Sequence, residues 1–196
     1  MTSRVLVAGV GNVFLSDDGF GVEVVNRLAA RALPADVELV DVGLRARDLA
    51  YRLLDGYRAL VLVDATQQGQ PPGTLYTLEH DLDAAVASSG PAAPVGHETD
   101  PDAVLALLVS MAAAMGVPRP VERVIVVGCE PAALGEAIGL SPPVAAAVDR
   151  AVDIVAEIAT ALVDPALLDP ALLDPALLNS ALLEPERSAH VPGNPR

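Results

Sequence analysis

The chain has few cysteines and few aromatic residues. Only one cysteine, Cys129, occurs among 196 residues, so no internal disulfide can form and a reducing compartment is expected. Tryptophan is absent and aromatic residues make up 3% of the chain, although 52% of it is hydrophobic. We therefore expect a core built on Val, Leu and Ala, large enough for one domain.

The chain also lacks a membrane-length hydrophobic run and a surplus of basic residues. The longest apolar stretch, residues 103–117, contains Ser110 and is shorter than the ~20 residues that a membrane span needs. Near the N-terminus, Arg4 leads directly into a short apolar run, without the long hydrophobic segment of a signal peptide. The 12 basic and 26 acidic residues give a net charge of −14, which repels nucleic acid and anionic membranes. We expect a cytoplasmic protein that binds neither.

Short apolar runs alternate with helical patterns in the first part of the chain. Strands are expected at residues 4–10, 37–42, 59–65, 74–79 and 124–128, and helices at 19–33, 46–54, 100–116 and from Ser141-Pro142 onward. This alternation predicts a largely parallel sheet that is covered by helices on both faces. In such a sheet the ligand crevice lies at the carboxyl ends of the strands.

The end of the chain is a different kind of segment. From Asp164 the unit DPALL repeats, and proline returns every five residues from Pro165 to Pro175. Each proline interrupts a continuous helix because it lacks an N–H and clashes with the preceding turn. We therefore expect an α/β domain at residues 1–163 and a flexible low-complexity tail at residues 164–196.

The stretch GVGNVFLSDDGFG, residues 9–21, follows the first strand and leads into a helix. Its glycine turn is similar to a dinucleotide-binding turn, but Phe14 stands where the third glycine belongs. Asp17 and Asp18 place two negative charges at the helix start, where they complement the helix dipole and would repel a pyrophosphate. Simple helix capping is the structural alternative for these aspartates.

Two more polar residues are expected at the same edge of the sheet. Asp64 ends an apolar strand, where an ionised carboxylate costs free energy unless a cation or hydrogen-bond donors meet it. A cap on the turn at residues 66–69 is the alternative. His97 lies in a loop before the helix at residues 100–116, and such a loop either returns to the crevice or leaves the histidine solvated. Together with Asp18 these residues form a set of two carboxylates and one imidazole that suits nickel or zinc.

Other site types find little support in the sequence. No HExxH or CxxC pair is present, so a standard zinc site is not indicated, and no Ser-His or Cys-His nucleophilic arrangement is apparent. Cys129 is expected to pack as a small hydrophobic residue. Glu98 and Glu130 either support the site or are solvated.

Several segments together resemble the hydrogenase maturation endopeptidases. The segments are VAGVGNVFLSDDGFGVEVVNRL, VDVGLRARDLAYRLLDGYRALVLVDA, GHETDP and VIVVGCEP with the later IGLSPPVAAAVDRAV. They occur in the family's order over about residues 4–162. The resemblance implies a three-layer α/β/α fold. Together with the strand pattern, in which residues 74–79 alternate like an edge strand, this predicts a mostly parallel, five-stranded twisted sheet.

The resemblance also implies an endopeptidase that removes the C-terminal extension of a [NiFe] hydrogenase large-subunit precursor after nickel insertion. Asp18, Asp64 and His97 match the family's metal-contacting residues and are the expected catalytic and metal-binding set. Nickel is then supplied by the substrate, and no permanently bound cofactor is expected. Hydrolysis proceeds either through metal polarisation of the carbonyl or through a water activated by a carboxylate.

Two other functions remain as alternatives. A non-catalytic metal-sensing chaperone would use the same ligands without cleavage, and a nucleotide-binding regulator would use Gly9 and Gly11. One departure from the family pattern concerns Asp41, which is followed by Val42-Gly43 where many members have Gly-Thr. This leaves the hydrogenase subgroup open.

Overall fold

The computed structural model describes residues 4–80, 101–117 and 120–164. The strands are β1 (Val5–Val10), β2 (Val37–Gly43), β3 (Ala59–Ala65), β4 (Leu75–His80) and β5 (Arg123–Cys129). The helices are the 3₁₀ helix η1 (Ser16–Gly19) and the α-helices α1 (Phe20–Leu28), α2 (Ala46–Leu53), α4 (Pro101–Ala114) and α5 (Pro142–Val163).

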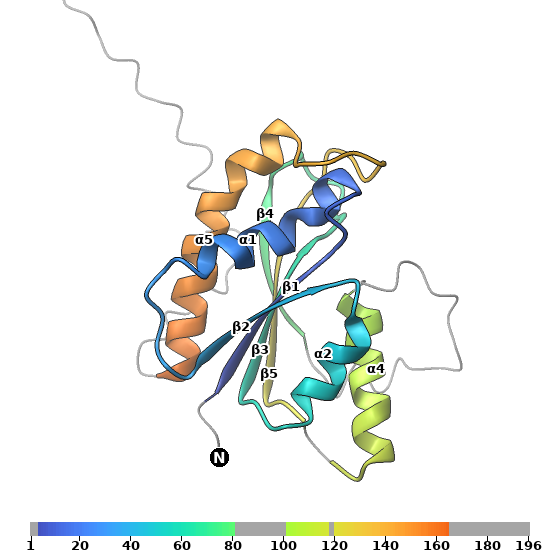
Figure 1. Cartoon of the computed structure of the whole chain (residues 1–196), viewed down its shortest axis with the longest axis vertical. Coiled ribbons are helices and arrows are strands. Elements are labelled where there is room, and N and C mark those ends of the chain that lie inside the picture. Colours follow the sequence, from blue (N-terminus) through green and yellow to red (C-terminus); the bar gives the residue numbers. More distant parts are fainter. Residues whose placement is uncertain (1–3, 81–100, 118–119, 165–196) are drawn as a thin grey trace, which may run out of the picture.

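The strands form one five-stranded sheet in the order β2-β1-β3-β5-β4. β1, β2, β3 and β5 run parallel, and β4 pairs antiparallel with β5 at one edge. Helices α1 and α5 cover one face of the sheet, and α2 and α4 cover the other (Figure 1). The predicted three-layer α/β/α fold with an edge strand is confirmed.

The side chains of β1 show why its sequence is apolar throughout. Val5 and Val7 pack in the core on the side of α1 and α5, whereas Leu6 and Ala8 pack on the side of α2 and α4. Successive side chains of a strand point to opposite faces, so a strand covered on both sides carries an unbroken apolar run. The sheet therefore separates two hydrophobic cores, one on each face, and the loops connect the strands at its two edges where the strands end.

The first helix begins within one residue of its predicted start but ends earlier than predicted. It is preceded by η1, and it ends at Leu28 instead of continuing to residue 33. Beyond Leu28 the backbone hydrogen bonds join residues three apart instead of four. Ala30 N donates to Arg27 O, and Arg31 N donates to Leu28 O. Such i→i+3 bonds close a helix, and Pro34 disfavours helical geometry at the residue before it.

Helix α5 closes the described part of the chain. The predicted apolar face is confirmed, since Val144, Val148, Val152, Val155 and Ile158 are all buried. No helix in the described ranges is both long and apolar enough to span a membrane. The tail predicted from residue 164 onward lies, apart from its first residue, outside the described residues, so the division into domain and tail stays a prediction.

Candidate active site

Two of the three predicted site residues, Asp18 and Asp64, lie near the carboxyl ends of β1 and β3. These strands pair in parallel with Gly9 opposite Val63, so they end side by side. Gly21, in the first turn of α1, packs closely against the carboxyl ends of both strands. A Cβ added to Gly21 would lie only 2.1 Å from Val63 O of β3 and 2.5 Å from Val10 O of β1. The start of α1 therefore lies directly over the two strand ends, and Asp18 is in the turn just before it.

Asp18 is held at this edge by the glycine turn after β1. Gly11 has a φ of +119°, which side-chain-bearing residues rarely adopt. A Cβ on Gly11 would also lie 1.8 Å from Asp18 O, so only glycine fits against the backbone of Asp18. The Asp18 side chain is half-buried, and its Oδ2 accepts a hydrogen bond of 2.6 Å from Asn12 N. The turn therefore fixes one carboxylate beside the end of β1.

The same turn argues against a phosphate-binding role. In a dinucleotide-binding turn, backbone N–H groups point at the ligand phosphate. Here the N–H of Asn12 donates to Asp18, and the N–H of Phe14 donates to Asn12 Oδ1 at 3.0 Å. These N–H groups of the turn are therefore bonded to the protein's own side chains, one of them the Asp18 carboxylate, and do not point at a phosphate. This disfavours the nucleotide-binding alternative.

Asp64 lies one residue beyond Val63, near the end of β3. Its side chain is buried, at 4% exposure, and the residue pairs with Gly128 of β5 in the sheet register. Oδ1 accepts a hydrogen bond of 2.9 Å from Ala65 N. Asp64, near the end of β3, and Asp18, in η1 between β1 and α1, therefore lie at the same edge of the sheet.

Glu130 is the acid that caps the turn at residues 66–69. It accepts hydrogen bonds from Gln68 N at 2.7 Å, from Gly69 N at 3.2 Å and from the hydroxyl of Tyr76. Burial opposes its charge, but these bonds outweigh that effect and hold the pKa of Glu130 below its usual value. Two N–H groups of this turn therefore go to Glu130, and Glu130 is a structural brace instead of a solvated acid.

Asp17 has a different role from its neighbour Asp18. It is completely buried. Its carboxylate accepts four hydrogen bonds of 2.6 to 3.0 Å, from Ala132 N, Ala133 N, Ser141 N and Ser141 Oγ. Burial acts to raise the pKa of Asp17, but the bonds from Ser141, Ala133 and Ala132 outweigh it and lower the pKa. Asp17 therefore fastens the loop between β5 and α5 to η1.

Neither aspartate acts as the helix cap that the sequence allowed. The N-cap positions of η1 and α1 are Leu15 and Gly19, and neither makes a side-chain capping bond. Ser141, at the N-cap of α5, likewise makes no capping bond to its own helix, because its hydroxyl donates to Asp17. No local pattern in the sequence marks this long-range pairing.

Cys129 packs in the core, as predicted. It is fully buried among the side chains between the sheet and α5. Burial, together with the nearby charges of Asp17 and Glu130, raises the pKa of the thiol to about 12. A thiol that stays protonated serves neither as a nucleophile nor as a metal ligand.

His97, the third predicted site residue, lies outside the described residues, as does Glu98. The structure brings Asp18 and Asp64 to one edge of the sheet, and the position of His97 stays a prediction. Within the described ranges, no group of three or more His, Cys, Asp and Glu side chains is arranged to hold a metal ion. Two carboxylates attract a divalent cation but leave most of its coordination positions to other ligands.

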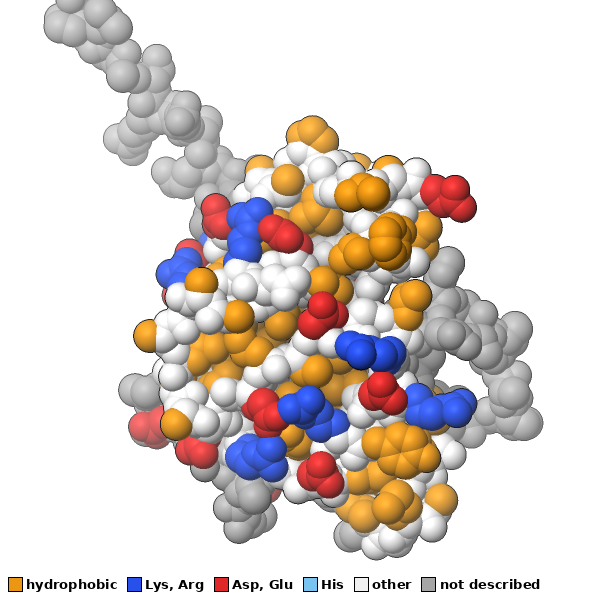
Figure 2. All heavy atoms as spheres, in the orientation of Figure 1, with side chains coloured by type: hydrophobic (Ala, Val, Ile, Leu, Met, Phe, Trp, Pro, Cys, Tyr) orange, Lys and Arg blue, Asp and Glu red, His pale blue; other side chains and the backbone are white. Residues whose placement is uncertain are grey.

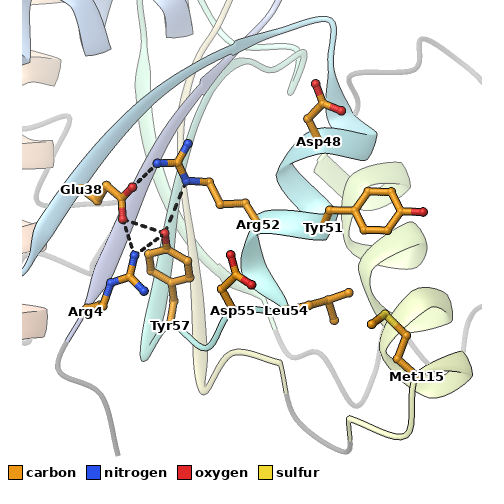
Figure 3. A pocket seen from close by; sticks show the side chains of 9 residues that line it. All are labelled: Arg4, Glu38, Asp48, Tyr51, Arg52, Leu54, Asp55, Tyr57 and Met115. Atoms are coloured by element: carbon orange, nitrogen blue, oxygen red, sulfur yellow. Dashed lines mark hydrogen bonds and ion pairs between the residues drawn. The ribbon is translucent and has the colours of Figure 1, made fainter.

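A hollow of about 650 Å³ lies at the opposite end of the sheet (Figure 3). Its two arginines are already paired. Arg4 Nη2 donates to Glu38 Oε2 at 2.7 Å, and Arg52 donates to Glu38 Oε1. Tyr57 contributes a hydroxyl to the same carboxylate at 2.7 Å and a ring 4.3 Å from the Arg4 guanidinium. The hollow adjoins the amino ends of β1 and β2, away from the edge where such folds bind ligands.

Known proteins similar to this chain share both its sequence and its fold. Residues 22–158 match the family model described as hydrogenase maturation protease. The chain is 37% identical over 151 residues to the hydrogenase expression/formation protein HupD of Rhodobacter capsulatus. The aligned region covers 76% of this chain and 68% of that protein.

Solved structures extend the similarity to three dimensions. The chain is similar to the hydrogenase maturating endopeptidase HybD from E. coli, with a TM-score of 0.63 and 30% identity over 78% of this chain and 89% of that one. It is also similar to the hydrogenase 2 maturation peptidase from a Thaumarchaeota archaeon, with a TM-score of 0.57 and 33% identity over 79% and 97% of the two chains. Each similarity covers most of the α/β domain.

Proposed function

This chain belongs to the hydrogenase maturation protease family and is a peptidase, and we propose that it removes the C-terminal extension of a [NiFe] hydrogenase large-subunit precursor after nickel insertion. Nickel enters the reaction as part of the substrate. A chain whose single cysteine is buried and unpaired suits a reducing compartment, and we assign the reaction to the cytoplasm.

The observation that carries the proposal is the placement of Asp18, in η1 after β1, and Asp64, near the end of β3, at the same edge of the sheet. Asp18 is half-buried and Asp64 is buried, so both carboxylates lie in a setting where water screens charge less than it does in bulk solvent. Two like charges at one edge favour the approach of a cation. Because two carboxylates supply few ligands, a metal that arrives with ligands from its own protein binds better than a free ion.

His97 completes the proposed set. An imidazole beside two carboxylates suits a borderline divalent metal such as nickel. Contact between these three side chains and a precursor-bound nickel would hold the scissile peptide against the edge of the sheet. A precursor without nickel lacks this contact and binds in the productive position less well, so cleavage becomes conditional on metal insertion.

Two routes to hydrolysis agree with this arrangement. A carboxylate at Asp18 or Asp64 can accept a proton from the attacking water. Alternatively, the metal polarises the scissile carbonyl while the carboxylates orient the metal. In neither route does the buried thiol of Cys129 take part.

The direct test uses matched precursor samples that differ only in nickel. Purified enzyme is incubated with nickel-loaded and with nickel-free large-subunit precursor, and the products are measured by mass spectrometry. We expect loss of a C-terminal peptide from the loaded precursor alone. Equal cleavage of both samples would contradict nickel sensing, and intact loaded precursor would contradict the proposed substrate.

A further inference from the structure

Three large apolar side chains are exposed beside the candidate active site. Val13 and Phe14, in the loop after β1, are 44% and 66% exposed, and Ile138, in the loop between β5 and α5, is 87% exposed. We call these three residues the apolar rim. Figure 2 shows hydrophobic side chains gathered at the end of the molecule where Figure 1 places these two loops.

The two loops that carry the apolar rim are bonded to each other. Leu15 and Ala137 form a parallel β-bridge. Ser16 N donates to Ala137 O at 2.9 Å, and Ala137 N donates to Phe14 O at 3.1 Å. The buried carboxylate of Asp17 adds its bonds to the same loop. The rim is therefore presented by an ordered scaffold, and its exposure does not come from a frayed end.

The apolar rim adjoins the candidate active site and is bordered by negative charge. A Cβ on Gly19 would lie 3.1 Å from Val13 Cα, so the rim packs against the residue that follows Asp18. On the other loop, the exposed Glu136 lies two residues before Ile138. An apolar surface is thus flanked by two carboxylates next to the strand ends.

We propose that the apolar rim binds an apolar segment of the hydrogenase precursor that has Lys or Arg residues beside it. This inference rests on the proposed function, because it takes the precursor as the substrate. The net charge of −14 and the bordering carboxylates attract a basic partner segment and oppose a second copy of this chain. Exposed apolar surface of this kind marks a protein contact, and here the contact would seat the precursor over Asp18 and Asp64.

The chain supplies a matched control for this inference. Tyr51 and Met115 are also large and exposed, at 56% and 61%, but they line the hollow at the other end of the sheet (Figure 3). The test compares the double variant Phe14→Ser/Ile138→Ser with the double variant Tyr51→Ser/Met115→Ser, both in the full-length chain. Cleavage of nickel-loaded precursor is followed over a range of precursor concentrations and of NaCl.

We expect the rim variant to raise KM about tenfold or more while kcat changes little, because a docking contact outside the reacting groups is lost. The control variant should keep both constants, and Phe14→Leu should keep KM close to the wild-type value. For the wild type, KM should rise with NaCl because salt screens the attraction between the acidic border and basic residues. All substituted side chains are exposed, so thermal unfolding should stay unchanged.

The outcomes separate the two proposals. An unchanged KM in the rim variant, with normal cleavage by the wild type, would overturn the docking inference and leave the proposed function intact. If the wild type fails to cleave the loaded precursor, both are overturned. Sedimentation of both proteins provides a further check. If the wild type is a dimer, the rim variant is a monomer and KM is the same for both, the apolar rim serves self-association and the inference is overturned.

Discussion

Asp17 accepts hydrogen bonds from both the backbone N–H and the hydroxyl of Ser141, at 2.6 and 2.8 Å, across a separation of 124 residues. This pairing joins η1 to the start of α5. It also sets the position of the loop between β5 and α5 relative to the loop that carries Asp18. The geometry of the candidate site therefore depends on a carboxylate that is itself completely buried.

The first prediction concerns the substitution Asp17→Asn. The amide keeps one acceptor oxygen but turns an NH₂ group toward backbone donors that are then left without an acceptor. We expect the free energy of unfolding to fall by about 3 kcal/mol, measured by urea denaturation. Asp149→Asn is the control, because Asp149 is 83% exposed and its ion pair with Arg27 should contribute less than about 1 kcal/mol. Equal effects of the two substitutions would contradict the assigned role.

The second prediction is a loss of stability in acid. Hydrogen bonds from Tyr57 and Arg52 lower the pKa of Glu38 from 4.5 to about 2, and the pKa values of Asp17 and Glu130 are also lowered. A carboxyl that binds protons more weakly in the folded state stabilises it above the unfolded pKa, and this stability is lost as the pH falls through the folded pKa. Urea denaturation should show constant stability near neutrality and a decline from about pH 4.5 to pH 2.

The variant Glu38→Gln isolates one contribution to that decline. It removes a titrating carboxylate at the amino ends of the strands, so the decline below pH 4.5 should become shallower while cleavage at neutral pH persists. An acid profile identical to that of the wild type would show that Glu38 does not titrate in this range.

The third prediction concerns the glycine turn. In Gly11→Ala the new methyl group would lie 1.8 Å from Asp18 O, so the turn must shift and Asp18 must move with it. We expect destabilisation together with loss of cleavage. Gly56→Ala is the matched control, because Gly56 also has a positive φ, +85°, but has open space around it. It should cost only about 1 kcal/mol and leave cleavage unchanged, as measured by denaturation and product analysis.

The fourth prediction addresses the two aspartates directly. Asparagine keeps an acceptor oxygen for Asn12 N in Asp18→Asn and for Ala65 N in Asp64→Asn, so it removes charge and preserves shape. We expect kcat/KM for the loaded precursor to fall at least about 100-fold in each variant. The stability of Asp18→Asn should match that of the wild type. Cleavage at the wild-type rate in either variant would remove that residue from the catalytic set.

Asp17 and Asp18 show the limit of prediction from sequence. They are identical residues in adjacent positions, and both stand at the start of a predicted helix. One is buried and saturated by donors from a distant loop, and the other lies at the edge of the sheet. A local pattern reports hydrophobic period and capping preference, but the donors that a carboxylate meets depend on which loops the fold brings beside it.

The sequence by itself determined the alternation of strands and helices, the parallel sheet and the appearance of Asp18 and Asp64 at its carboxyl edge. These follow from apolar runs and turn residues that act over a few positions. Only the tertiary structure decided that Glu130 caps the turn after β3, that Asp17 binds Ser141, and that the loops carrying Phe14 and Ile138 pair beside the site. Each of these contacts joins segments that are far apart in the chain, and their positions depend on how helices and loops pack around the finished sheet.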